Sequence, residues 1–282
     1  DNRDSGNEEF TISYANYPGE EPVLKGSIPV TDWTKQEGKV YTAKLNEKTE
    51  INAVYENGIR GHKARWPKGQ FALSAGYSES NPFTQFSFHP GDIPVIKEKT
   101  GLQVFLWPGG KDGHRSWFTQ NIEVKDLDYS NNRITLSKNS LHEMGKGSRY
   151  VLQKSKELLS EPGEYHLDVQ ANTLYYIPRD ADHLKDKIEI PLVKTIFKFE
   201  GSSPDKPIRN IKIMGLSFCN TDAYDDYVQV HEEHLYYKDG AIVMDNSAGF
   251  TVQNCRVYNT GFHAIVMSNG AENNRIHGNH LY

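Results

Sequence analysis

Short runs of alternating apolar and polar residues dominate the chain, and glycine, proline, asparagine or aspartate bounds most of them. Residues 10–14, 40–45 and 122–124 are clear examples. A period of two places the apolar side chains on one face of a strand, so these runs predict β-strands. The dipeptide Asn57-Gly58 predicts a hairpin turn between two of them. Residues 140–160 are the exception, because their apolar spacing predicts a helix.

The last third of the chain contains a repeat. Residues 241–248 (AIVMDNSA) recur 23 residues later as 264–271 (AIVMSNGA), and residues 250–258 align with 274–282 at an offset of 24. Residues 211–221 align with 250–260 at an offset of 39, which is the same period enlarged by an insertion of about 15 residues. Short strands at a nearly fixed period are typical of a solenoid, in which each repeat stacks on the one before it.

Stacking in this register predicts columns of equivalent side chains, with neighbours about 4.8 Å apart. The two apolar columns are Ile213, Val252 and Ile276, and Phe218, Val257 and Leu281. Asn220 and Asn259 fall at one turn, where asparagine tolerates left-handed backbone and can bond to its neighbour in the stack. A leucine-rich repeat has a similar period, but its Leu-x-x-Leu-x-Leu spacing is absent. The pattern therefore favours a parallel β-helix.

Composition adds few constraints. The formal net charge is −5 over 282 residues, and the sequence shows no basic cluster of the kind that binds nucleic acid. No apolar run reaches the length of about 18 residues that a membrane span needs, and no signal peptide is visible. Cys219 and Cys255 fall in different columns, so we expect two free thiols in the core. The sequence opens in a loop and stops inside a predicted strand, so we expect that it was cut from a longer chain.

Six motifs spread over nearly the whole chain follow one order. They occupy residues 5–26, 30–43, 53–58, 63–67, 161–179 and 210–218. The most specific is EPGEYHLD at 161–168, followed by NTLYYIPR at 172–179. In this order the motifs resemble those of secreted bacterial β-helix glycosidases, above all glycoside hydrolase families 141 and 120, which include fucosidases, xylanases and xylosidases.

The resemblance implies an all-β chain in which a right-handed parallel β-helix is interrupted by an inserted antiparallel β-sandwich or barrel-like domain. Residues 1–26 would be a partial N-terminal coil, residues 27–190 the inserted domain, and residues 191–282 further coils of the helix. It also implies a secreted, periplasmic or cell-surface bacterial protein. In such enzymes the catalytic carboxylates lie on the coils, so some or all of them are expected beyond Tyr282.

The insertion after Thr221 is the best local candidate for chemistry, because a solenoid carries its longer loops on one face, often the binding face. Glycosidases need two carboxylates, one to protonate the leaving oxygen and one to attack or to activate water. The candidate catalytic residues are Asp225, Asp226, Glu232 and Glu233. The candidate substrate-binding residues, which could stack on a sugar ring or bind its hydroxyl groups, are Tyr224, Tyr227, His231, His234 and His263.

The sequence contains no recognised metal-binding motif. His231 and His234 are three residues apart, unlike the four-residue separation of the zinc motif His-Glu-x-x-His. A calcium site built from Asp222, Asp225 and Asp226 stays open, since calcium prefers such oxygen ligands, and otherwise no cofactor is predicted. Trp107 or Trp117 could form a sugar platform, although packing in a core is the commoner role of tryptophan.

Three functions remain open at this point. The leading one is a glycoside hydrolase that binds a carbohydrate, with no role for nucleic acid or membrane and no prediction of oligomeric state. The second is a polysaccharide lyase on the same scaffold, which would need lysine, arginine, histidine or tyrosine as its base. The third is a carbohydrate-binding β-helix without catalysis. The insertion at 222–240 is acidic and contains a single lysine, which favours hydrolase over lyase.

Overall fold

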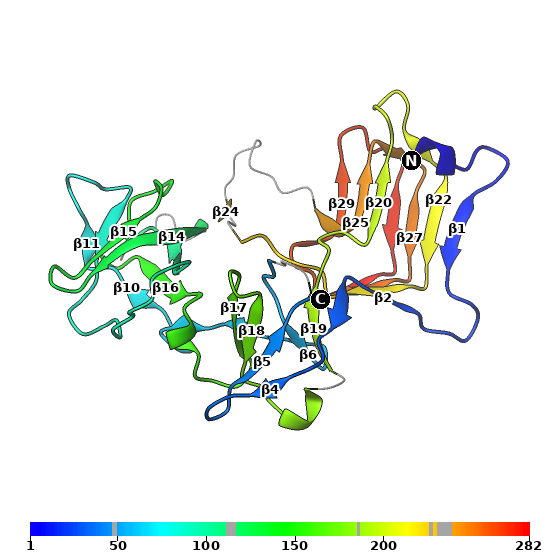
Figure 1. Ribbon diagram of the computed structural model, residues 1–282. Helices are drawn as coiled ribbons and strands as arrows, with labels where there is room; N and C mark the ends of the chain where they lie inside the picture. The colour runs from blue at the N-terminus through cyan, green and yellow to red at the C-terminus, as the bar shows by residue number, and fades with distance from the viewer. Residues whose placement is uncertain (47–49, 111–116, 185–186, 226–227, 230–238) are drawn as a thin grey trace.

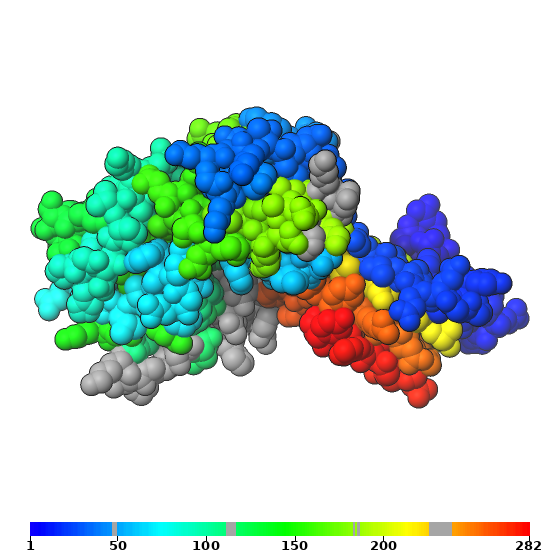
Figure 2. Space-filling model, turned by 90° about the horizontal axis from the view of Figure 1, so that it is seen from below, coloured from blue at the N-terminus to red at the C-terminus, as the bar shows by residue number. Residues whose placement is uncertain are grey.

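The computed structural model describes all residues except 47–49, 111–116, 185–186, 226–227 and 230–238. Within the described residues, helix is limited to three 3-10 turns: η1 (Asn2–Asp4), η2 (Lys156–Leu158) and η3 (Ala181–His183). The remaining elements are β-strands, so the predicted all-β class is confirmed. Figure 1 shows three parts side by side: stacked parallel strands, a central group of small sheets, and a large antiparallel sheet. In the space-filling view of Figure 2, the segments that form these parts lie in the same order across the molecule.

Four of the sheets are entirely parallel, and the chain visits them in a fixed order. From β20 (Phe197–Glu200) the chain runs through β21 (Ile208–Arg209), β22 (Ile211–Met214) and β23 (Ser217–Cys219), each in a different parallel sheet, and then repeats this order. One such repeat is called a coil. The first sheet contains β1 (Ile12–Ala15), β22 (Ile211–Met214), β27 (Thr251–Gln253) and β30 (Arg275–His277). The second contains β2 (Val23–Lys25), β23 (Ser217–Cys219), β28 (Arg256–Tyr258) and β31 (His280–Leu281). The third contains β20 (Phe197–Glu200), β25 (Gly240–Asp245) and β29 (His263–Ser268), and the short pair is β21 (Ile208–Arg209) with β26 (Ser247–Ala248).

The register of the coils is the one that the repeat predicts. Ile213 pairs with Val252, and Val252 pairs with Ile276. In the neighbouring sheet the partners of Val257 are Phe218 and Leu281. Ile213, Val252, Phe218 and Val257 belong to one buried apolar cluster, Ile276 packs against it, and Leu281 at the end of the second column is exposed. Cys219 and Cys255 are buried free thiols, as predicted.

Asparagine marks the turn between the second sheet and the next segment. Asn220 and Asn259 both have positive φ, 59° and 51°, and the side-chain amide of Asn259 donates to Oδ1 of Asn220 over 3.2 Å. The predicted stacking of these two residues is therefore confirmed. Their bond links two successive coils at the corner, where the ladder of backbone hydrogen bonds is interrupted.

The large antiparallel sheet, called the nine-stranded body, has its own core. Its main path is β10 (Ala72–Leu73), β16 (Arg149–Gln153), β13 (Gln103–Trp107), β14 (Thr119–Asp128), β15 (Arg133–Leu136), β12 (Gln85–Ser87) and β11 (Gly76–Tyr77). Strand β9 (Arg65–Trp66) pairs with β16, and β24 (Val228–Gln229) pairs with β14. Since β24 lies between β23 and β25 in the sequence, the insertion predicted from the repeat adds a strand to this distant sheet.

Between the coils and the nine-stranded body lies a central body of two small sheets. One sheet contains β4 (Thr34–Lys35), β5 (Tyr41–Lys44), β18 (Thr173–Tyr176), β17 (Glu164–Asp168) and β8 (His62–Lys63). The other contains β3 (Ser27–Pro29), β19 (Ile188–Pro191), β6 (Tyr55–Glu56) and β7 (Ile59–Arg60). The strands β6 and β7 form the hairpin predicted from Asn57-Gly58, and both of these turn residues have positive φ. The central body has a core cluster separate from that of the nine-stranded body.

The predicted helix at 140–160 is wrong. Residues 149–153 form strand β16, which lies between β10 and β13 in the nine-stranded sheet. Tyr150 and Leu152 point into the core, two residues apart, as in a strand. Over the longer window 140–160, the other apolar residues gave a spacing that resembled a helix. Long-range pairing with β13 and β9 decides the conformation, and the only helical turn in this stretch is η2.

The register can be tested through one core position. Phe218 is fully buried in the coil core, so Phe218→Ala should lower the free energy of unfolding by about 3–5 kcal/mol through lost burial and a residual cavity. Val23 lies in the same sheet with 46% of its surface exposed, so Val23→Ala should cost less than about 1 kcal/mol. Urea denaturation followed by circular dichroism measures both. Equal costs for the two variants would contradict the buried column.

Candidate functional site

The segment after β23 leaves the coils and is held by the central body. The hydroxyl group of Tyr55 donates to the carbonyl oxygens of Thr221 and Asn259, over 3.1 and 2.9 Å. The backbone N–H of Asn52 donates to Oδ1 of Asp222 over 2.9 Å. These bonds fix the path of the chain as it crosses from the coils toward the other two parts.

Asp225 is where the three parts meet. Its carboxylate accepts hydrogen bonds from Nζ of Lys63 at 3.1 Å and from Nζ of Lys154 at 2.8 Å. Lys63 belongs to the central body, whereas Lys154 directly follows β16 of the nine-stranded body. The carbonyl oxygen of Asp225 also accepts from the side chains of Gln103 and Asn121, both over 3.1 Å. We call Asp225 with its two lysines the ionic junction.

The ionic junction keeps its carboxylate charged. Burial alone would raise the pKa of Asp225, but the positive charges of Lys63 and Lys154 outweigh it, and the pKa lies below its ordinary value. Burial lowers the pKa of Lys63, and the charge of Asp225 opposes that shift. An ionised carboxylate suits the nucleophile or base of a glycosidase and does not suit the acid, which must carry a proton.

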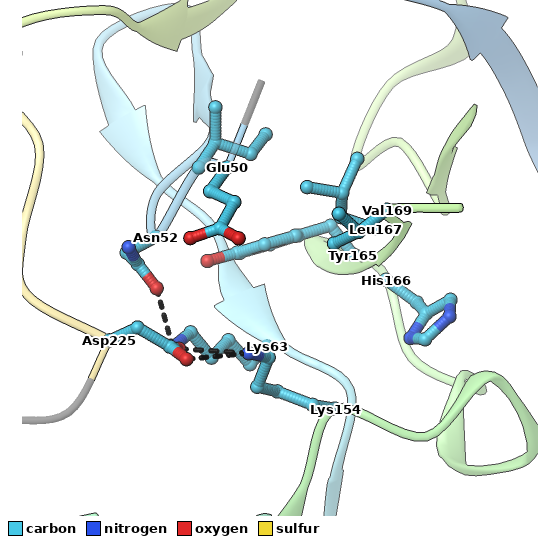
Figure 3. A pocket seen from close by; sticks show the side chains of 10 residues that line it. Glu50, Asn52, Lys63, Lys154, Tyr165, His166, Leu167, Val169 and Asp225 are labelled. Atoms are coloured by element: carbon cyan, nitrogen blue, oxygen red, sulfur yellow. Dashed lines mark hydrogen bonds and ion pairs between the residues drawn. The ribbon is translucent and has the colours of Figure 1, made fainter. Parts of the chain in front are cut away.

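A small pocket of about 70 Å³ opens beside the junction (Figure 3). Its lining residues are Glu50, Ile51, Asn52, Lys63, Lys154, Tyr165, His166, Leu167, Val169 and Asp225. The side chain of Glu50 makes no hydrogen bond or ion pair with any residue that the structure describes, and residue 50 is exposed. Figure 3 shows its carboxyl group on the same side of the pocket as the hydroxyl group of Tyr165.

Tyr165 provides a polar group without a hydrogen-bond partner among the described residues. Its side chain is 3% exposed, and its hydroxyl group is buried without a hydrogen bond to the described residues. Burial raises the pKa of Tyr165, so the hydroxyl group keeps its proton and can donate. A buried donor without a partner is costly, and it is explained here if a ligand or water accepts its hydrogen bond.

A larger cleft of about 660 Å³ adjoins the small pocket, and the two share Asn52, Lys63 and Tyr165. All three parts of the molecule line it, and their residues are Asn52, Arg60, Gly61, His62, Lys63, Arg65, Phe105, Asn121, Gln153, Tyr165, Ala223, Tyr224, Gly261, Phe262 and His263. Its volume is in the usual range for binding sites of small molecules. Aromatic rings and basic side chains dominate the lining, and no carboxylate is present among these described residues.

The structure describes three of the nine residues predicted for the site. Asp225 lies in the small pocket, and Tyr224 and His263 line the larger cleft. The ring of Tyr224 meets that of Phe262 edge-on with centroids 5.9 Å apart, and its hydroxyl group donates to Asp239. The structure thus brings these three together around two adjoining cavities. The other predictions, Asp226, Tyr227, His231, Glu232, Glu233 and His234, lie outside the described residues.

Most of the basic side chains that line the larger cleft were not predicted from the sequence. Arg60, His62, Lys63 and Arg65 fall within six consecutive residues, RGHKAR, and this density of basic residues was a readable signal. In the sequence, residues 63–67 were noted only as one of the motifs that carry the family resemblance. Glu50, Lys154 and Tyr165 had no local signal, because their importance comes from partners far away in the sequence.

The two tryptophans proposed as sugar platforms differ in their surroundings. Trp107 packs between Phe71 and Phe105, with ring centroids 4.7 and 4.0 Å away, and the Arg149 guanidinium lies over its ring. Trp117 is 53% exposed. The Trp107 group is continuous with the cleft, because Phe105 lines the cleft as well. A platform role of either tryptophan stays a prediction.

The acidic groups proposed for calcium have other contacts. Asp222 accepts the backbone N–H of Asn52, and Asp225 binds two lysines; Asp226 is outside the described part. Among the described residues no group of three or more histidine, cysteine or acidic side chains is arranged to hold a metal ion. The same residues contain no helix with the length and apolar character for crossing a membrane.

Comparison with known proteins identifies similarity at the level of the fold. No family model matches the sequence, and no curated protein matches it. A solved structure titled "Glycoside hydrolase" superposes with a TM-score of 0.75 at 17% identity, over 93% of this chain and 52% of its own. The chain therefore spans about half the length of that neighbour and shares its fold. A complex of XylC with xylose gives a TM-score of 0.36 at 15% identity, over 90% of this chain and 32% of its own.

The small pocket contains a group whose pKa can be tested. Burial lowers the pKa of His166 from 6.5 to about 4, and its Nδ1 atom is buried without a partner in the described chain. Between these values the unfolded chain binds a proton that the folded chain does not, so the free energy of unfolding should fall as the pH drops from 6.5 to 4. His166→Gln should make this fall less steep, by at most about 1.4 kcal/mol per pH unit, the limit for one proton.

Urea titrations at several pH values measure this slope. The control is His89→Gln, because His89 is exposed and does not line the pocket; it should change the slope less than His166→Gln does. Identical slopes for wild type and His166→Gln would mean that His166 is not the buried neutral imidazole described here.

Proposed function

We propose that the chain is part of a glycoside hydrolase, and that its coils are a right-handed parallel β-helix. The support for the fold is the in-register parallel pairing of successive coils and the TM-score of 0.75 to a structure titled "Glycoside hydrolase". Residues 1–26 and 191–282 would belong to the helix, and residues 27–190 would form the inserted antiparallel domain. The motifs favour a relative of families 141 and 120 and a secreted, periplasmic or cell-surface location.

One observation carries the proposal of hydrolysis: Glu50 and Asp225 line the same small pocket, beside a cleft with aromatic walls. Asp225, ionised by its lysines, would be the nucleophile or the base that activates water. Glu50, which has no partner within the described chain, would protonate the leaving oxygen. Two carboxyl groups with different environments are what this reaction needs. Asp226, Glu232 and Glu233 remain alternative candidates for either role.

Aromatic and polar residues around the carboxylates would bind the sugar. Phe105, Tyr224 and Phe262 offer ring faces and edges to the cleft, and the apolar face of a sugar ring packs against such surfaces. The Tyr165 hydroxyl group and the side chain of Asn52 lie at the border of both cavities, where they could bind sugar hydroxyl groups. His263 lines the same cleft, in the substrate-binding role predicted for it.

Glu50→Gln tests the proposed acid. The substitution keeps the shape of the side chain and removes the transferable proton, so kcat on a susceptible oligosaccharide should fall by roughly 100-fold or more. Because Glu50 is exposed, the thermal midpoint should stay within 1–2 °C of wild type, a shift of about 0.5 kcal/mol or less. Release of reducing ends measures kcat.

Glu79→Gln is the matched control, since Glu79 is an exposed glutamate away from both cavities. Asp225→Asn should also abolish turnover, but it should lower the thermal midpoint as well because two lysines lose their carboxylate. Full activity of Glu50→Gln would remove Glu50 from the pair, and full activity of Asp225→Asn would remove the small pocket as the catalytic centre.

A polysaccharide lyase is a second candidate, and the composition of the larger cleft favours it. The lining contains arginine, lysine, histidine and tyrosine, the residue types that such an enzyme uses as its base and to neutralise a uronate carboxylate. Burial, together with the charges of Arg179 and Arg65, lowers the pKa of His62, so its imidazole is neutral and able to accept a proton at pH 7. A lyase releases unsaturated products that absorb near the ultraviolet edge, whereas a hydrolase releases reducing ends alone.

A further inference from the structure

The larger cleft is lined by positive charge. Five of its described lining residues have basic side chains, and the same lining contains no aspartate or glutamate. The cations among them are Arg60, Lys63 and Arg65, and the other two are the imidazoles of His62 and His263. The whole chain has a formal charge of −5, so the positive potential of the cleft is a local feature that opposes the overall charge. Clefts lined by one sign of charge concentrate ligands of the opposite sign.

The two arginines retain unused hydrogen-bond donors. The guanidinium group of Arg60 makes no ion pair or side-chain hydrogen bond with a described residue. Arg65 donates from Nε to the carbonyl oxygen of Pro67 and from Nη2 to that of Gln70, over 3.2 and 2.6 Å. These bonds orient the guanidinium group and leave Nη1 of Arg65 without a partner in the described chain.

Neighbouring carboxylates are paired with other cations, although the charge of Glu164 also acts on Arg65. Glu56 is buried and accepts hydrogen bonds from Tyr176 and Arg179. Glu164 is buried and forms an ion pair with Lys68. At the ionic junction two lysines share a single carboxylate, which leaves an excess of one positive charge at the border of the cleft. Glu56, Glu164 and Asp225 are therefore already paired with other cations.

The remaining lining indicates what kind of anion would fit. Phe105, Tyr224 and Phe262 surround the basic groups with aromatic surface, which a free phosphate or sulfate ion would not need. A volume of about 660 Å³ accommodates several rings of a saccharide. A guanidinium group binds carboxylate and sulfate through paired N–H donors, and such charge-assisted bonds are about twice as strong as neutral ones.

We propose that this cleft binds an acidic saccharide, a sugar chain with carboxylate or sulfate groups, and that Arg60 and Arg65 bind the anionic group. The inference rests on the proposed function to the extent that the ligand is a carbohydrate. It goes further by naming the substrate class and two specificity-determining residues. Neither arginine takes part in bond cleavage, so both belong to substrate binding.

The test is a calorimetric comparison of ligands that differ only in charge. Oligogalacturonate and its methyl-esterified form share the same sugar backbone, and a sulfated neutral-sugar oligomer and its unsulfated form make the second pair. The acidic member of at least one pair should bind at least tenfold more tightly at low salt. Raising the ionic strength should reduce that preference, because salt screens exposed charges. Which pair discriminates identifies the anionic group.

Arg60→Gln and Arg65→Gln should each weaken binding of the preferred acidic oligomer about tenfold, the effect of one lost charge-assisted contact, and should change binding of its neutral counterpart less than twofold. Arg209→Gln is the control, because Arg209 is an exposed arginine on β21 of the coils, outside both cavities. It should bind as wild type does. Thermal midpoints of all three variants verify that they are folded.

The outcomes separate this inference from the proposed reaction. If the protein cleaves a neutral oligosaccharide and binds the acidic and neutral members of both ligand pairs equally tightly, the inference is overturned and the hydrolase proposal stands. Arginine-dependent binding of the acidic oligomer without release of reducing ends would uphold the inference and overturn the hydrolase. Tighter binding of a single-stranded oligonucleotide than of every acidic saccharide would also overturn it, because the cleft would then recognise a polyanion of another class.

Discussion

The ionic junction is the interaction on which the geometry of the site depends. Asp225 comes from the segment that leaves the coils, and it joins Lys63 of the central body to Lys154 beside the nine-stranded body. Each part has its own apolar core, so burial within a part does not determine how the parts are arranged. Polar contacts across their borders must do so, and the junction is the point that all three share.

The ionic junction has an electrostatic cost, and it also gives the site its positive charge. Two lysines compete for one carboxylate, and removing the carboxylate would leave two like charges close together in a partly buried place. The hydrogen bond that Lys63 donates to Oδ1 of Asn52, and those that Gln103 and Asn121 donate to the backbone carbonyl oxygen of Asp225, compensate part of this cost. What remains is a corner with excess positive charge, and Lys63 at this corner lines both cavities.

Sequence predicted the coils well because their rules are local and repeated. An offset of 24 or 39 residues aligned Ile213, Val252 and Ile276, and the pairing in space is the same. Two further columns with positive φ were present in the sequence and were not used: Asn210, Gly249 and Asn273, and Gly215, Asn254 and Gly278. Since only glycine and asparagine adopt this conformation readily, such columns mark the corners of each coil.

The site could be predicted only in part, because its partners are far apart in the chain. Asp225 was singled out for its chemistry, yet Lys63 is 162 positions away and Lys154 is 71 positions away. The helix wrongly predicted at 140–160 has the same cause, since pairing with β13 and β9 determines the strand β16. Judged from its own residues, the acidic 222–240 insertion favoured a site built from carboxylates. Folding brings Ala223, Tyr224 and Asp225 of this insertion against the basic run at 60–65. The character of the cleft therefore depends on the segment that these residues meet as much as on the residues themselves.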